Sequence, residues 1–236
     1  MVVIARRNLL DEYFYFLMSL LVVVPVVYGF SFTIDKNLIH PAVPRPWVLY
    51  VHAIVFSGWL AFFTLQSGFV RARKTQWHRR AGLFGIVFGT AIPILGCTTA
   101  IAMGRFNTIA LHATDAEQAL IIPLFDMVCF TTAFALGVYW RKKPEFHRRL
   151  IFIATCVLTA AGFGRFPPEI LLPYLFYGGV DLLILFGVAR DLVVERRIHP
   201  VYLCAIPALV AGQSVVTYTF FHSSPLWVRI AHALLS

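Results

Sequence analysis

Long apolar runs, separated by short polar or basic segments, follow one another along most of the chain. A helix needs about 20 apolar residues to cross ~30 Å of hydrocarbon. Strands of a membrane barrel would alternate apolar and polar residues over about 10 positions, and this sequence shows no such alternation. The pattern predicts an all-α, polytopic membrane protein with seven transmembrane helices, at about residues 12–32, 48–70, 82–103, 119–140, 149–166, 170–189 and 200–221.

Composition agrees with a membrane location. Hydrophobic residues make up 59% of the 236 residues and charged residues 13%, and the mean hydropathy is +0.78. A soluble domain carries roughly 45–50% apolar and about 25% charged residues. No segment has the composition of a linker, so residues 1–236 are predicted to form one domain. The cysteines lie in apolar segments without C-x-x-C spacing, which indicates small buried side chains and no disulfide framework: Cys97, Cys129, Cys156 and Cys204.

The net charge of +9 follows the predicted topology. If the N-terminus is cytoplasmic, only Lys36, Arg45, Arg105, Arg165 and Arg229, of the 20 basic residues, lie at the outer side. This asymmetry obeys the positive-inside rule. It predicts a multi-pass protein with its N-terminus inside and its C-terminus outside. Nucleic acid is not expected as a partner, whereas membrane lipids and other membrane subunits are.

The sequence aromatic-His-Arg-Arg occurs twice, 69 positions apart, and suggests duplicated hairpins at about residues 48–103 and 119–166. An aromatic residue at a helix start prefers the headgroup level, and arginines bind lipid phosphates. We therefore expect these motifs to anchor the cytoplasmic face to lipid phosphate or another anion, through His78, Arg79, Arg80, His147, Arg148 and Arg149.

Ionisable groups inside a membrane are costly and are candidates for function. The deep polar residues of several predicted helices fall in the outer half of the bundle. They predict a pocket for a small molecule or lipid in the periplasmic half, with walls rich in phenylalanine. The alternative is that these groups only pair between helices. The predicted ligand-binding residues are His52, Asp126, Arg165, Asp181, Gln213 and Tyr218.

Haem b is an alternative cofactor. The two-haem, ascorbate-reducible b-type cytochromes place histidines on four successive helices, joined in two pairs. His78 and His147 resemble one pair in spacing, but the partner of His52 would fall near Gln118–Pro123, where there is no histidine. The resemblance implies a haem-b electron-transfer membrane protein. A further alternative is an accessory subunit of a larger membrane complex.

A metal-dependent hydrolase is a remote alternative, because zinc accepts His and Asp and activates water. Five residues could meet at the outer side, but they lack helical ligand spacing, so no metal site is predicted: His52, His112, Asp126, His222 and His232. Whether the protein is an enzyme is left open.

Seven short motifs follow one another between about residues 50 and 200: V-H-A-I-V-F-S-G-W, Q-S-G-F-V, W-H-R-R-A-G, P-L-F-D, P-E-F-H-R-R-L-I-F-I-A-T, G-R-F-P and V-D-L-L. Together they resemble an uncharacterised family of bacterial seven-helix membrane proteins, and more distantly a larger membrane family with an H-R-x-x-G turn. The resemblance implies a bacterial inner-membrane protein and no known activity. It draws attention to His52, His78, Asp126, His147, Arg165 and Asp181.

Overall fold

The computed structural model describes residues 9–236, and every regular element in this part of the chain is a helix. The α-helices are α1 (Leu9–Leu21), α2 (Val23–Ser31), α3 (Trp47–Arg71), α4 (Thr75–Ala110), α5 (Ala116–Ala119), α6 (Ile121–Tyr139), α7 (Pro144–Val157), α8 (Ala160–Phe163), α9 (Phe176–Val194), α10 (Pro200–Phe221) and α11 (Pro225–Leu235). Single turns of π-helix and 3-10 helix lie at η1 (Asp35–Ile39) and η2 (Pro173–Leu175).

Six helical segments of the described chain are long and apolar enough to cross a membrane, which supports a multi-pass membrane protein. They are Leu9–Ser31, Trp47–Arg71, Thr75–Ala110, Ala116–Tyr139, Pro144–Phe163 and Pro200–Phe221. The seventh predicted span, 170–189, does not join them. Its helix, α9, carries three charged residues, Asp181, Arg190 and Asp191. The sequence prediction overlooked the last two because they lie just beyond its boundary.

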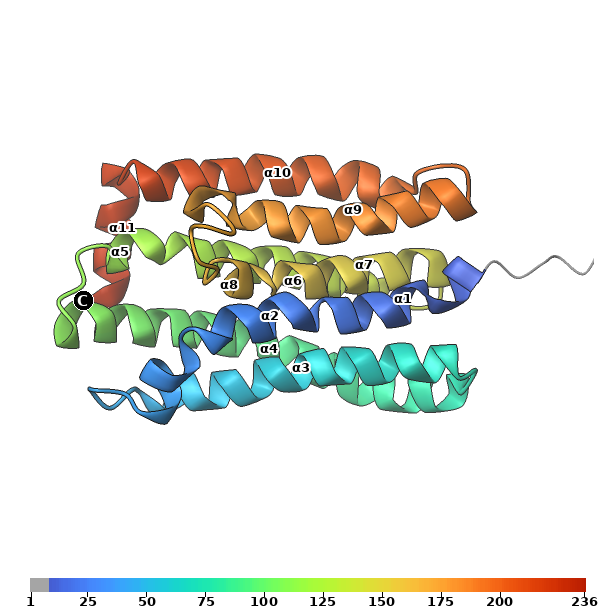
Figure 1. The fold of residues 1–236 in the computed structure, drawn as a ribbon, viewed down its shortest axis with the longest axis horizontal. Helices are drawn as coiled ribbons and strands as arrows, with labels where there is room; N and C mark the ends of the chain where they lie inside the picture. Colours follow the sequence, from blue (N-terminus) through green and yellow to red (C-terminus); the bar gives the residue numbers. More distant parts are fainter. Residues whose placement is uncertain (1–8) are drawn as a thin grey trace, which may run out of the picture.

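The long helices run along one axis of the molecule (Figure 1). The described chain begins at the end that also holds the α3–α4, α6–α7 and α9–α10 turns, here called the basic end. Helix α11 lies across the opposite end, where it packs on α4 and α5. The predicted inner loops therefore gather at one end of the bundle. Which side of a membrane this end faces stays a prediction.

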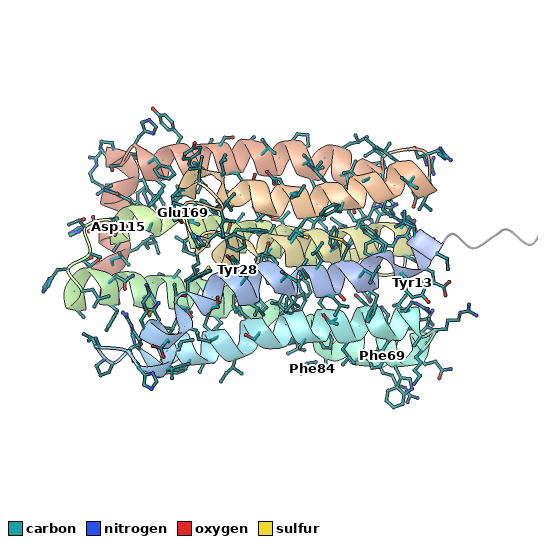
Figure 2. The ribbon with its side chains drawn as sticks, in the orientation of Figure 1. Tyr13, Tyr28, Phe69, Phe84, Asp115 and Glu169 are labelled. Atoms are coloured by element: carbon teal, nitrogen blue, oxygen red, sulfur yellow. The ribbon has the colours of Figure 1, made fainter. Side chains whose placement is uncertain are left out.

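Helix α7 occupies the centre of the bundle and is the most buried of the six segments. The core around it is rich in aromatic rings. Trp59 of α3 meets Phe130 and Phe134 of α6 edge-on, at 5.5 and 5.6 Å between ring centroids. Side chains fill the space between neighbouring helices along the bundle (Figure 2). A charged side chain on the inner face of α7 must consequently find its partners inside the protein.

Proline and glycine shape the first span. Helices α1 and α2 are divided at Val22, three residues before the buried Pro25. Proline has no N–H to donate to the carbonyl four residues earlier, so the helix breaks there. Further along α2, a Cβ atom on Gly29 would lie 2.1 Å from the carbonyl oxygen of Gly162 in α8. The two backbones can approach this closely only without a side chain.

The α3–α4 and α6–α7 hairpins have matching turns. Lys74 is the N-cap residue of α4 and Lys143 that of α7. The backbone N–H of His78 donates to Lys74 O at 3.1 Å, and that of His147 donates to Lys143 O at 3.0 Å. Each histidine therefore occupies the same position in the first turn of the second helix of its hairpin. This equivalence places both histidines at the basic end.

Candidate functional site

The imidazole rings of His78 and His147 face each other between α4 and α7. Their centroids are 6.2 Å apart, and the ring planes are inclined at 74°. Both side chains are half-buried. Equivalent positions of the two hairpins thus bring two imidazole rings together between α4 and α7.

The Nδ1 atom of each ring is held by a neighbouring helix. His147 Nδ1 lies 2.9 Å from the carbonyl oxygen of Gly137 in α6, to which it can only donate. Its Nε2 is then free to accept or to bind a metal. The buried Gln66 of α3 is oriented so that its amide nitrogen donates and its amide oxygen accepts a hydrogen bond. Its amide nitrogen then lies 2.7 Å from His78 Nδ1. In this orientation Nδ1 accepts, so the neutral ring carries its proton on Nε2, whereas a half-turn of the amide would offer an acceptor to Nδ1–H. A hydrogen bond from Nδ1–H to a carbonyl oxygen, as at His147, orients a histidine ligand.

Open space adjoins His78 at Gly82, one turn further along α4. In the same orientation the Gln66 amide oxygen accepts from the Gly82 N–H at 3.1 Å, so both residues lie on the face toward α3. A Cβ atom added to Gly82 would meet nothing within 4 Å. At Gly85 and Gly89, further along the helix, the rings of Phe62 and Phe134 fill that space. A side chain at Gly82 would therefore extend into open space one turn from His78.

The two histidines alone do not make a site for a bare metal ion. Within residues 9–236, no three His, Cys, Asp or Glu side chains are grouped so that they could hold one. Zinc takes three or four protein ligands. The pair can instead complete the coordination of a metal that brings its remaining ligands with it.

A buried ion cluster lies nearby at the basic end and includes Arg149. Arg149 is fully buried, and its Nε and Nη2 donate to the two carboxylate oxygens of Asp191 at 2.8 and 2.6 Å. This guanidinium faces protein carboxylates, because α7 turns it into the core, and the anchoring of lipid phosphate or another anion by the six motif residues stays a prediction. Arg148 also pairs with a protein carboxylate, because its Nη2 donates to Glu195 at 3.0 Å. Arg79 and Arg80 are exposed.

The cluster holds three cations and three anions and joins α1, α7, α9 and the turn after α9: Asp11, Arg148, Arg149, Arg190, Asp191 and Glu195. Arg190 contacts both Asp11 and Asp191. Burial alone would raise the pKa of Glu195, but hydrogen bonds from Arg190 and Arg149 lower it to about 2. The arrangement ties helices together. Its sequence signal was the Arg-Asp pair at the end of an apolar span.

Three of the six residues predicted to bind a ligand form two interhelical pairs. The Tyr177 hydroxyl of α9 donates to Asp126 of α6 at 3.0 Å. The Gln213 amide of α10 donates to Asp181 of α9 at 2.9 Å. These hydrogen bonds link α6, α9 and α10, as expected when polar groups pair between membrane helices. Tyr177 was not singled out from the sequence, because it lies at the helix end beside an apolar segment.

The other three predicted residues lie apart from these pairs. Arg165 donates to Ala161 O, and its guanidinium carbon is 4.2 Å from the centroid of the Phe30 ring. His52 stacks on Phe56 at 3.9 Å. Tyr218 is exposed and stacks on His222.

Two surface hollows are described, and neither is lined by any of the six predicted residues. One, of about 380 Å³, lies beside α11 and includes Arg105, Glu117 and His232. The other, of about 440 Å³, lies at the α6–α7 turn. An outer ligand pocket formed by the six residues thus stays a prediction.

No protein family, curated protein or solved structure matches this chain. The resemblance to a bacterial seven-helix membrane family therefore stays a prediction. The function must be inferred from the geometry of the side chains.

Proposed function

We propose that this protein is a membrane electron carrier that binds haem b, and that His78 and His147 are the residues that would hold it. The observation that carries the proposal is the separation of 6.2 Å between the ring centroids. With metal–nitrogen distances of about 2.0 Å, two imidazoles on opposite sides of one metal have centroids about 6 Å apart. The spacing suits an iron atom between the rings.

Haem accounts better than a bare ion for a site with only two ligating side chains. The porphyrin supplies four nitrogens, so the protein has to provide only axial ligands. Held by both His78 and His147, the haem would supply reversible one-electron chemistry. Such a site favours one-electron transfer over the binding of oxygen or a substrate. An enzymatic reaction at the metal is therefore not part of the proposal.

Neighbouring residues would support this role without reacting themselves. The Gly137 carbonyl accepts from His147 Nδ1–H and leaves the Nε2 of that ring free to bind a metal, and the Gln66 amide would do the same for His78 after a half-turn that presents its oxygen to Nδ1–H. Gly82 leaves room beside His78. The exposed Arg79 and Arg80 follow His78 directly and could pair with the carboxylates of the cofactor.

The position of the pair in the bundle suits electron exchange with a partner at the membrane surface. Both histidines lie in the first turn of a helix at the basic end and are half-buried. A partner at this end could approach the site without entering the hydrocarbon region. The exposed cations would favour an acidic partner surface.

The haem content of the purified protein tests the proposal. The full chain is expressed with a haem precursor, purified in mild detergent and assayed as the pyridine haemochrome. We expect about one haem b per chain, reducible by dithionite. A protein that contains no haem and binds none when titrated with haemin would overturn the proposal.

A further inference from the structure

An open hollow of about 440 Å³ lies at the α6–α7 turn and is lined by five consecutive residues: Tyr139, Trp140, Arg141, Lys142 and Lys143. Three of these side chains are cationic and two are aromatic. The rings of Tyr139 and Trp140 meet edge-on at 5.6 Å between centroids. Tyr139 is 74% exposed, so it is available to a ligand from outside the bundle.

The positive charge of this hollow is not neutralised by the protein. Within residues 9–236, no carboxylate lies within ion-pair distance of Arg141, Lys142 or Lys143. Arg141 Nη1 donates only to the carbonyl oxygen of Val138, at 3.3 Å. Glu145 follows two residues after Lys143 but does not line the hollow. Three exposed cations thus line a hollow without a carboxylate partner among residues 9–236.

The equivalent turn between α3 and α4 provides an internal comparison. There, Arg71 and Arg73 lie 3.4 and 3.7 Å from the carboxylate of Glu12. The guanidinium of Arg71 also lies 3.7 Å from the centroid of the Tyr13 ring. Val70 and Arg71 stand where the second turn has its two aromatic residues. Two arginines of the α3–α4 turn are therefore paired with a carboxylate, whereas the equivalent α6–α7 turn has a cationic hollow.

We infer that the hollow lined by residues 139–143 binds the phosphate group of an anionic ligand, and that an anionic phospholipid headgroup is its source in the membrane. Arginine and lysine hold phosphate through charge-assisted hydrogen bonds. Tyrosine and tryptophan favour the headgroup level of a bilayer. This site is separate from the histidine pair and does not depend on haem.

Lipid binding to the detergent-purified full chain tests the inference by native mass spectrometry. The probes are phosphatidylglycerol, phosphatidylcholine and inorganic phosphate. The test variant is Arg141→Gln/Lys142→Gln/Lys143→Gln, and the matched control is Arg71→Gln/Arg73→Gln/Lys74→Gln. We expect the wild-type protein to prefer phosphatidylglycerol. We also expect the test variant to bind it about 10-fold or more weakly, because each lost cation weakens the attraction to anionic lipid.

The outcomes separate the alternatives. Inorganic phosphate that fails to displace phosphatidylglycerol identifies the lipid as the source, whereas displacement at low concentration identifies a site for free phosphate. An equal loss in the two variants would overturn the inference, because only total charge would then matter. Equal wild-type binding of phosphatidylglycerol and phosphatidylcholine would overturn it as well, and that result does not depend on the folding of any variant.

Discussion

His78 and His147 are 69 positions apart in the chain, yet their rings lie 6.2 Å apart between α4 and α7. They meet because each begins the second helix of its hairpin, four residues after a lysine N-cap. The hairpins pack so that the two helix starts adjoin at the basic end. A repeated local motif thus brings two imidazole rings together in the fold.

The open space at Gly82 predicts how the cofactor site responds to added bulk. Gly82→Leu should remove most of the bound haem, because the new side chain would occupy the space beside His78. Haem content per chain, measured on purified protein, checks this. Gly178→Leu is the matched control, since a Cβ atom there also meets nothing within 4 Å. Equal haem content in both variants would show that the space at Gly82 is not used.

The contact between Gly29 and Gly162 predicts a cost in stability. Gly29→Ala should lower the free energy of unfolding by about 1–3 kcal/mol, because the methyl group would meet a backbone carbonyl that cannot move aside. The thermal midpoint in detergent measures the effect. Gly178→Ala, which meets open space, should change the midpoint little. A Gly29→Ala protein as stable as wild type would mean that α2 and α8 separate without cost.

The Arg149–Asp191 pair predicts an asymmetry between single and double variants. Arg149→Met should destabilise the protein by about 3–5 kcal/mol, because it leaves a buried carboxylate with fewer partners. Arg149→Met/Asp191→Leu should cost less than the single change. Denaturant unfolding in mixed micelles measures both. Arg148→Met, at a side chain that is 33% exposed, should cost about 0–1 kcal/mol. A double variant less stable than Arg149→Met would contradict the role assigned to the pair.

Glu195 predicts a loss of stability in acid. Hydrogen bonds from Arg190 and Arg149 outweigh the effect of burial and lower its pKa from 4.5 to about 2. A lowered pKa stabilises the folded state above the unfolded value, and this contribution is lost as the pH falls from about 4.5 toward 2. Unfolding midpoints across this range should fall less steeply for Glu195→Gln than for wild type. Parallel curves would show that Glu195 does not contribute.

Hydrophobic pattern alone located most of the fold. Apolar runs long enough to span were sufficient to predict six helical segments, because length and hydropathy are local properties. The α9 span was misjudged at its end, where Arg190 and Asp191 are buried by pairing with residues from other helices. Such pairing depends on which helices are neighbours, and the sequence does not show that.

The site was predicted only in part for the same reason. The repeated histidines were visible as a motif, whereas their approach to one another depends on the packing of two hairpins. The deep polar residues Asp126 and Asp181 were identified, but their partners Tyr177 and Gln213 lie on other helices. Depth in the membrane can be counted along a chain, whereas the direction of a side chain around its helix is set by the neighbouring helices.

Electron paramagnetic resonance of the oxidised protein tests directly whether His78 and His147 both hold a haem. Wild-type protein should show a low-spin ferric signal, because two strong axial ligands are bound. His78→Ala and His147→Ala should each convert it to a high-spin signal or lose the haem, while His232→Ala, in α11 at the opposite end, should keep it. A low-spin signal unchanged in both histidine variants, or no haem in the wild-type protein, would contradict haem binding by this histidine pair.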